Sequence, residues 1–143
     1  MSEVANVLLV NRAIISDNNQ ILLLQRAEDD SHNAKLWEFP GGKVDTGEES
    51  TSGLIREVFE ETGLAIELSS PVAHVESELI TVGKYEGRLY VALFYAAQRL
   101  GGDLILSDEH SNAQWVVPEL ATKYALSRQS RRALVSLDKL GII

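Results

Sequence analysis

The sequence predicts a single α/β domain in which a mixed β-sheet is sandwiched between helices. Short apolar segments typical of strands recur along the chain, one helical pattern lies near its middle, and a second lies near its C-terminus. The 143 residues are enough for one domain with a proper hydrophobic core. Because no internal repeat or linker interrupts the pattern, we expect one domain over residues 1–143.

A β-hairpin and a polar loop are expected in the first part of the chain. Residues 6–15 are rich in Val, Leu and Ile, and a turn cluster at 16–19 separates them from a second strand at 21–25. Residues 27–35 are polar and predict a loop. In the next segment Pro40 fixes its own φ angle and two glycines permit sharp turns, which suits a backbone that comes close to a ligand.

A helix is expected over residues 50–61. Its apolar stripe at helical spacing consists of Leu54, Ile55, Val58 and Phe59. Glu48 and Glu49 stand where the helix begins, and acidic side chains there favour the partial positive charge of a helix N-terminus. Gly63 supplies a C-terminal stop in the left-handed conformation.

Strands dominate the second half of the chain. We expect them at residues 65–68, 72–81, 88–98 and 114–117, with a further short strand at 104–106. A helical turn at 118–120 and a helix capped by Ser127 should follow. The apolar side of that last helix should carry Ala133, Leu134, Leu137 and Leu140.

Composition excludes several classes of protein. The net charge of −8 argues against a protein that binds a nucleic-acid polymer, which would usually be basic. The absence of cysteine excludes disulfides, zinc–thiolate sites and a cysteine nucleophile. No signal segment or apolar run long enough to span a membrane is present, so we expect no membrane association and a cytoplasmic location.

Three glutamates share one side of the expected central helix: Glu57, Glu60 and Glu61. Carboxylates at this spacing repel one another. Either bulk water or a bound divalent cation can offset the repulsion, and Mg²⁺ prefers carboxylate oxygens. The spacing by itself favours the solvated helix face.

The longer sequence pattern around these glutamates favours a bound cation over a solvated helix face. Residues 42–64 read G-x5-E-x7-R-E-U-x-E-E-x-G-U, where U is apolar, and all nine specified positions match. The segment therefore resembles the Nudix box. The resemblance implies the Nudix fold, an α/β/α sandwich, and hydrolysis of a nucleoside diphosphate linked to another moiety. The implied cofactor is Mg²⁺, with Mn²⁺ as an alternative.

The same resemblance assigns metal ligands. They are Glu57, Glu60, Glu61 and the carbonyl of Gly41. Glu57 can also accept the proton of the attacking water, and the sequence does not divide base from ligand. Glu109, six residues before Trp115, matches an outlying metal-binding glutamate of MutT-like enzymes, and Asp108 is the alternative.

Three further residues within the box are given supporting roles. We expect Arg56 to pair with Glu48, which would orient the helix and hold the loop rather than contact phosphate. Gly53 lies between Glu57 and Glu60 around the helix. We hypothesise that it leaves room at the metal face; the alternative is plain tolerance of a small residue.

The segment before the box, residues 36–43, resembles the MutT-like branch, which removes pyrophosphate from nucleoside triphosphates. The positions assigned to the substrate are Arg26, His32, Phe39 and Lys43. For His32 an exposed loop position is an equal alternative, and Trp37 and Trp115 suit a core as well as base stacking. No asparagine occurs at residues 125–130, so recognition of oxidised guanine is not implied; Ser127 or Gln129 can bond a base edge there.

The resulting prediction is a Mg²⁺-dependent nucleoside triphosphate pyrophosphohydrolase, a monomer or homodimer whose partner is a small nucleotide. One alternative is hydrolysis of another nucleoside diphosphate derivative, such as ADP-ribose or a dinucleoside polyphosphate. Another is a catalytically silent nucleotide-binding module, although such a module does not need three mutually repelling carboxylates. An acidic Ca²⁺-binding or protein-binding surface ranks last, because no 12-residue calcium loop is present.

Overall fold

The computed structural model describes residues 6–28 and 34–143 of the chain. In chain order its elements are β1 (Val7–Asp17), β2 (Gln20–Arg26), β3 (Trp37–Glu38), β4 (Gly41–Lys43), α1 (Ser50–Thr62), β5 (Ala65–Leu68), β6 (His74–Leu79), β7 (Leu89–Gly101), β8 (His110–Val116), α2 (Pro118–Ala121) and α3 (Arg128–Lys139). The predicted hairpin and both predicted helices are confirmed. The last strand begins at His110, four residues earlier than expected.

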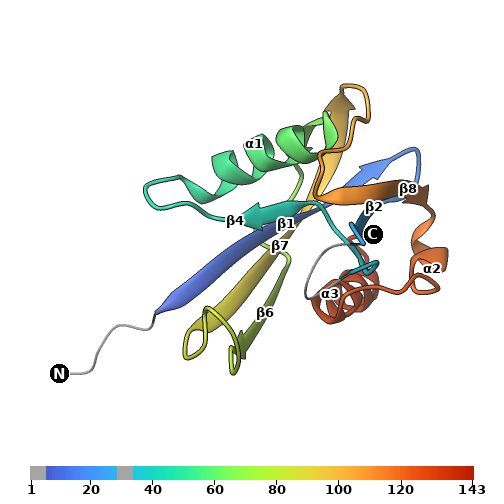
Figure 1. Cartoon of the computed structure of the whole chain (residues 1–143). Coiled ribbons are helices and arrows are strands. Elements are labelled where there is room, and N and C mark those ends of the chain that lie inside the picture. Colours follow the sequence, from blue (N-terminus) through green and yellow to red (C-terminus); the bar gives the residue numbers. More distant parts are fainter. Residues whose placement is uncertain (1–5, 29–33) are drawn as a thin grey trace.

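A mixed sheet built around β1 and β7 contains all of these strands (Figure 1). β1 runs parallel to β7 over residues 7–16 and antiparallel to β2 and β4. β6 pairs with the first half of β7 and β5 with its second half, whereas β3 and β8 pair with β2. This topology places β4, which leads into the loop before α1, against the middle of β1.

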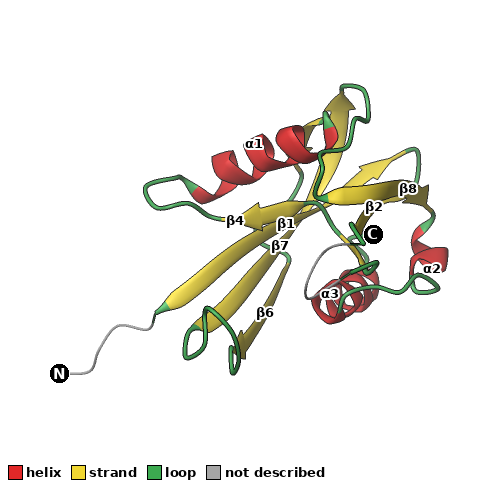
Figure 2. Ribbon diagram, in the orientation of Figure 1, coloured by secondary structure: helices red, strands yellow, loops and turns green. Residues whose placement is uncertain are grey.

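The central strands form two hydrophobic cores, one on each face of the sheet. On β1, Val10 and Ile14 belong to one core, whereas Ala13 and Ile15 belong to the other, as expected from the alternation of side chains along a strand. Side chains of α2 and α3 complete the first core and side chains of α1 complete the second (Figure 2). The predicted α/β/α sandwich is therefore confirmed.

Local signals set both ends of α1. The carboxylate of Glu49 accepts hydrogen bonds from the backbone N–H groups of Thr51 and Ser52, which caps the helix N-terminus. Gly63 ends the helix with a φ of 76°, a left-handed conformation that glycine adopts without strain. These ends lie within one residue of the predicted ones.

The buried face of α1 is narrower than the sequence predicts. Leu54 and Val58 are buried, but Ile55 and Phe59 are 38% and 59% exposed, so half of the expected stripe is wrong. Glu61 is only 4% exposed and takes the third inward position. Residues 54, 58 and 61 lie at i, i+4 and i+7 on one helix face, and contacts with the sheet decide that this face is the one buried.

Residues 104–106 form a loop rather than the expected strand. The backbone N–H of Ile105 donates to the carbonyl of Thr62 at 2.9 Å, and that of Ser107 donates to the carbonyl of Glu61 at 3.1 Å. The last carbonyls of a helix lack intrahelical partners. This loop pairs with the end of α1 instead of joining the sheet, and it leads directly to Glu109.

α3 begins where predicted, because the hydroxyl of Ser127 accepts a hydrogen bond from the N–H of Ser130. Three of its four predicted apolar side chains are buried, but Leu140 is 65% exposed because the helix ends at Lys139. Within the described ranges, the helices are too short or too polar to cross a membrane.

Candidate active site

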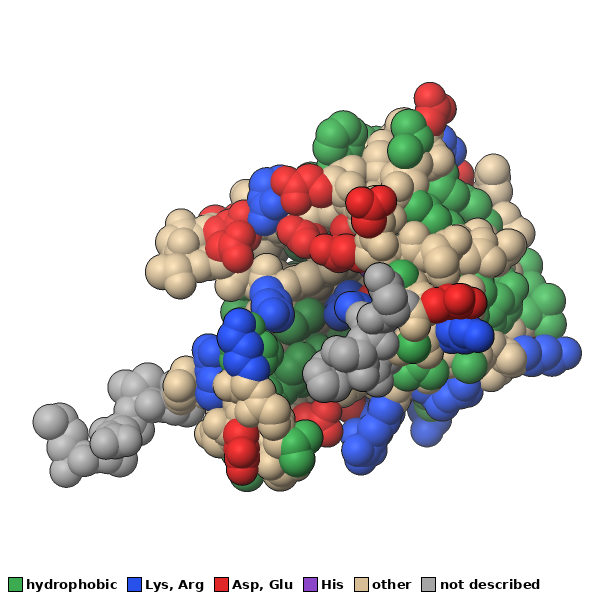
Figure 3. All heavy atoms as spheres, viewed as in Figure 1, with side chains coloured by type: hydrophobic (Ala, Val, Ile, Leu, Met, Phe, Trp, Pro, Cys, Tyr) green, Lys and Arg blue, Asp and Glu red, His purple; other side chains and the backbone are tan. Residues whose placement is uncertain are grey.

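A cleft of about 660 Å³ lies between α1 and the strands β1, β4 and β7. Its acidic lining residues are Asp45, Glu57, Glu60, Glu61 and Glu109. Its cationic and apolar lining residues are Arg12, Arg26, Lys43, Arg56, Leu8, Val10 and Tyr90. Figure 3 shows acidic side chains over α1 and, across a hollow with an apolar floor, a group of lysines and arginines. The cleft therefore has one acidic wall and one basic wall.

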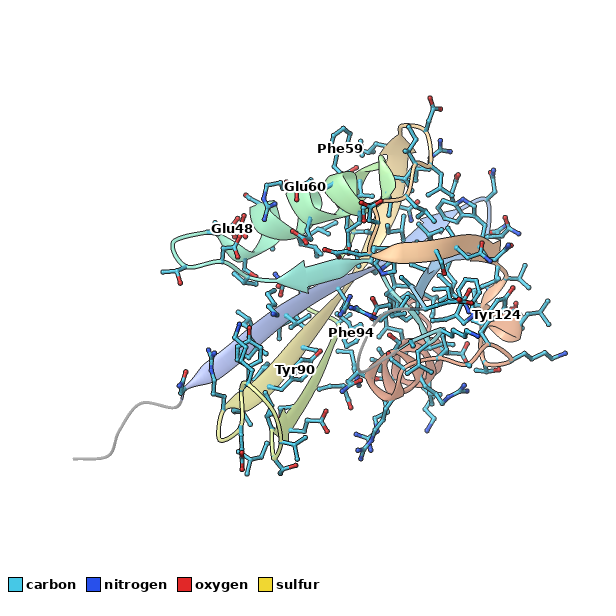
Figure 4. All side chains as sticks on the ribbon, in the orientation of Figure 1. Glu48, Phe59, Glu60, Tyr90, Phe94 and Tyr124 are labelled. Atoms are coloured by element: carbon cyan, nitrogen blue, oxygen red, sulfur yellow. The ribbon has the colours of Figure 1, made fainter. Side chains whose placement is uncertain are left out.

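The three glutamates of α1 differ in burial, which corrects the expectation of one outer face. The side chains of Glu60, Glu57 and Glu61 are 56%, 24% and 5% exposed. Figure 4 shows Glu48 and Glu60 along α1, with Tyr90 of β7 on the opposite side of the cleft. The acidic side chains thus form a series that runs from solvent into the interior.

Glu61 lies at the buried end of this series. Its Oε1 accepts a hydrogen bond from the backbone N–H of Gly41 at 2.8 Å. Burial raises the pKa of Glu61 to about 8; the charges of Glu109 and Glu57 act in the same direction, and Arg12 and the Gly41 N–H act against them. Glu61 therefore holds a proton at neutral pH unless a cation replaces it.

Gly41 can lie close to the backbone of β1 because it has no side chain. It adopts a φ of 146°, and a Cβ atom at this position would collide with the backbone carbonyl of Asn11 on the neighbouring strand. At Gly42 an added Cβ would lie 2.8 Å from Oε1 of Glu57. Both glycines therefore leave space that carboxylates or backbone of the cleft occupy.

Arg56 connects several of the acidic groups. Its Nε donates to Glu48 Oε2 at 2.9 Å and its Nη1 donates to Glu60 Oε2 at 2.8 Å, while Nη2 lies 3.4 Å from Glu57 Oε2. The predicted pair with Glu48 is confirmed, and Arg56 contacts two of the candidate metal ligands as well. Its positive charge offsets part of the repulsion among these acids.

Gly53 makes room for Glu48. An added Cβ at Gly53 would lie 2.5 Å from Oε1 and 2.6 Å from Cδ of Glu48. The expectation that this space belongs to the metal face is corrected accordingly: the carboxylate that Arg56 binds fills it.

A buried charged network lies beneath the cleft, and the sequence analysis missed it. Oε2 of Glu38 is 3.0 Å from Arg26 Nη1, 3.5 Å from Arg12 Nη1 and 3.0 Å from His110 Nε2. Burial by itself raises the pKa of Glu38, but Arg12, His110 and Arg26 outweigh it and lower the pKa to about 2. A signal existed: Arg12 interrupts an apolar strand and Glu38 stands between two aromatic residues, and charges inside such segments require partners.

Comparison with known proteins decides the family. A family model described as the NUDIX domain matches residues 7–137. The chain belongs to the Nudix family. A CTP pyrophosphohydrolase of Escherichia coli is 35% identical over 115 residues, which cover 80% of this chain and 79% of that protein. A MutT-like protein of Streptomyces ambofaciens is 29% identical over 128 residues, covering 90% of this chain and 75% of the relative.

A solved structure supports the same assignment. The MutT protein of Methanosarcina mazei superposes with a TM-score of 0.81 at 28% identity, covering 98% of this chain and 99% of that one. The chain is therefore a Nudix hydrolase of the MutT-like branch, as the resemblance of residues 36–64 implied.

Glu109, the expected outlying metal ligand, lies close to Glu61. Ligand atoms of Glu61, Glu109 and His110 all lie within 4.8 Å of one another. Asp108, the alternative to Glu109, is not part of this group in the described structure. Carboxylate oxygens suit Mg²⁺ or Mn²⁺, so the residues present fit a divalent cation.

The residues expected to contact substrate have different positions. Arg26 and Lys43 line the cleft, and Nζ of Lys43 donates to the hydroxyl of Tyr85 at 3.1 Å. Phe39 is fully buried in the core, so its side chain supports the floor of the cleft instead of lining it. Gln129 donates to Glu78 of β6 at 2.8 Å.

Three further positions are candidates for substrate binding in the sequence: His32, Trp37 and Trp115. His32 lies outside the described residues. Trp37 packs edge-on against Tyr124 with ring centroids 5.0 Å apart and contacts the core beside α3 (Figure 4 labels Tyr124). Trp115 packs against the opposite core. Both tryptophans are thus partly buried side chains that pack against the two cores.

A larger hollow of about 800 Å³ lies beside the β1–β2 turn and the C-terminus. Asp17 and Glu119 line it, and none of its described lining residues is a lysine, arginine or histidine. A polyphosphate requires positive charge, so the cleft at α1 suits a nucleotide and this hollow does not.

Proposed function

We propose that this Nudix hydrolase converts a nucleoside triphosphate to a nucleoside monophosphate and pyrophosphate, with Mg²⁺ as its cofactor and Mn²⁺ as an alternative. The observation that carries the proposal is the division of charge across one cleft. The acids Glu57 and Glu60 line the same cleft as the cations Arg26 and Lys43. A polyphosphate chain needs positive groups for its oxygens and carboxylates for the cation that accompanies it.

The basic wall and the apolar floor accommodate the two parts of the substrate. Arg26 and Lys43 bind phosphate oxygens, and the volume of about 660 Å³ lies in the range of small-molecule sites. Leu8, Val10 and Tyr90 supply the apolar surface for the base. The CTP pyrophosphohydrolase activity of the Escherichia coli relative supports a nucleoside triphosphate as substrate.

The acidic wall performs the hydrolysis. A bound divalent cation supplies the positive charge that polarises phosphate oxygens and the attacking water. Glu57, Glu60, Glu61, Glu109 and the carbonyl of Gly41 are the residues that would hold it. Glu57 is also placed to accept the proton of the water, because its carboxylate is partly exposed to the cleft. Arg56 and Glu48 orient the helix.

A panel of nucleotides tests the proposal. Canonical and oxidised nucleoside triphosphates, ADP-ribose and a dinucleoside polyphosphate are each incubated with the protein and Mg²⁺, and the release of pyrophosphate and phosphate is measured. We expect pyrophosphate from a triphosphate. Turnover of ADP-ribose or the dinucleotide alone would instead favour another Nudix activity, and no turnover at all would favour a silent nucleotide-binding module.

The proposal also covers the partner of the enzyme, its cellular compartment and its oligomeric state. Its partner is a small nucleotide rather than a nucleic-acid polymer or a membrane, and the cytoplasm is the compartment where a nucleotide-pool enzyme meets that substrate. The proposed assembly is a monomer or a homodimer.

A further inference from the structure

His110 is the first residue of β8, and its side chain is completely buried between Glu38 and Glu61. Its Nε2 is 3.0 Å from Glu38 Oε2, whereas its Nδ1 has no hydrogen-bond partner among the described residues. A buried polar atom without a partner is costly and uncommon. This nitrogen points to Oε2 of Glu61 at 3.9 Å.

The partners of Glu38 determine which nitrogen of the ring carries the proton. Its Oε2 also accepts a hydrogen bond from Nη1 of Arg26 at 3.0 Å and lies 3.5 Å from Nη1 of Arg12. Two guanidinium groups keep this carboxylate an acceptor, so Nε2–H of His110 donates to it. In the neutral ring Nδ1 therefore carries the lone pair, and it lies 3.9 Å from Oε2 of Glu61. A carboxylate that fixes a histidine in this way is the usual support of a metal-binding imidazole.

The spacing of the two facing atoms identifies what fits between them. A separation of 3.9 Å is too long for a direct hydrogen bond. A water with two bonds of about 2.8 Å in tetrahedral geometry would hold its partners about 4.6 Å apart. Two metal–ligand bonds of about 2.1 Å reach up to about 4.2 Å. The separation of 3.9 Å is within the reach of two such metal–ligand bonds, so both atoms can bind one divalent cation.

We propose that Nδ1 of His110 is a direct ligand of a divalent cation that Glu61 and Glu109 also bind. The proposal rests on the metal dependence of the proposed function and adds a nitrogen ligand to its oxygen ligands. An imidazole nitrogen favours first-row transition-metal ions, whereas Mg²⁺ prefers oxygen alone. This position consequently binds Mn²⁺ more tightly than Mg²⁺, and Glu38 holds the imidazole in the required orientation.

Pulsed electron paramagnetic resonance of bound Mn²⁺ tests the proposal without any turnover. The whole protein is loaded with Mn²⁺ in the absence of nucleotide, and coupling of the metal to an imidazole nitrogen is recorded. The chain has three histidines, so the H32Q/H74Q variant keeps His110 as its sole imidazole. We expect the nitrogen coupling in the wild type and in H32Q/H74Q.

The variant His110→Gln provides the complementary measurement. A glutamine amide can still donate to Glu38 but has no atom in place of Nδ1, so the coupling should disappear and the Kd for Mn²⁺ should rise about tenfold or more. The Kd for Mg²⁺, from competition, should change less. His74→Gln is the matched control, because Nε2 of His74 also bonds a carboxylate, that of Glu76 at 2.7 Å.

The outcomes separate this inference from the proposed function. Three outcomes overturn the assignment of His110 as a ligand. They are nitrogen coupling that persists in His110→Gln, nitrogen coupling that is absent from H32Q/H74Q, and a failure of the wild type to bind Mn²⁺. If His110→Gln does not fold, the H32Q/H74Q spectrum decides. Pyrophosphate release with Mg²⁺ in a protein without nitrogen coupling removes His110 as a ligand and leaves the hydrolase intact. Nitrogen coupling without turnover of any nucleotide keeps His110 as a ligand and removes the proposed hydrolase activity.

Discussion

The backbone N–H of Gly41 donates a hydrogen bond to Oε1 of Glu61 at 2.8 Å, which joins the start of β4 to the last turn of α1. The bond connects two parts of the cleft that are 20 residues apart in the chain. It also leaves Oε2 of Glu61 facing Nδ1 of His110. The protonation of this one carboxyl group therefore affects both folding and cation binding.

Glu61 makes the stability of the metal-free protein depend on pH. Its pKa is raised from an ordinary 4.5 to about 8, so between these values the native state holds a proton that the unfolded chain has released. Stability is then lost as the pH rises through that window. Relative to Glu61→Gln, which cannot ionise, the wild type should lose up to a few kcal/mol, since one pKa unit corresponds to about 1.4 kcal/mol.

Urea unfolding of both proteins in EDTA at pH 5 and pH 8 measures this effect. Titrating groups that do not interact with Glu61 contribute equally to the two proteins and cancel in the difference. A difference between wild type and Glu61→Gln that stays the same at both pH values would show that the buried carboxyl has an ordinary pKa.

Glu60→Gln should separate activity from stability. The side chain is 56% exposed and its main partner is Arg56 at 2.8 Å, an exposed ion pair that contributes little to stability. Loss of a metal-binding carboxylate should lower kcat by about two orders of magnitude or more. The measurement is kcat with Mg²⁺ together with Tm. Glu67→Gln, an exposed acid on β5, is the control, and wild-type rates in Glu60→Gln would remove Glu60 from the site.

The sequence predicts those features of the fold that depend on neighbouring residues. Glu49 and Gly63 act within a few residues of themselves, so the ends of α1 are correct to within one residue. The strands follow from short segments rich in apolar residues, as on β1. The pairing of Arg56 with Glu48 follows from a fixed spacing within one motif.

Features that depend on distant contacts could not be predicted in this way. Ile55 and Phe59 carry the same helical signal as Leu54 and Val58, and only the position of the sheet decides which pair is buried. The network of Arg12, Arg26, Glu38 and His110 joins residues from separate strands. No local sequence pattern indicates that these four residues lie together. The geometry around Glu61 could therefore be obtained only from the structure.

Gly42→Ala should displace the carboxylate of Glu57. The added Cβ would lie 2.8 Å from Glu57 Oε1, and the tip of a flexible side chain moves at little cost to folding. We expect Tm to stay nearly constant and kcat to fall about 10- to 100-fold, because a displacement near 1 Å has effects of that size at a reacting centre. Gly101→Ala is the matched control, since an added Cβ there meets no described atom within 4 Å. Equal rates in the two variants would contradict this role.

Gly53→Ala should show two opposite effects that a double-mutant cycle can separate. Alanine favours a helix interior over glycine by about 1 kcal/mol, but its Cβ would meet Glu48 Oε1 at 2.5 Å and displace the carboxylate that binds Arg56. In the Glu48→Ala background the obstacle is absent, so the substitution should raise the free energy of unfolding by about 1 kcal/mol. In the wild-type background the gain should be smaller or reversed, and kcat should fall. The cycle is measured by urea unfolding of all four proteins. An identical gain in both backgrounds, with undiminished turnover, would mean that Gly53 is simply a tolerated small residue.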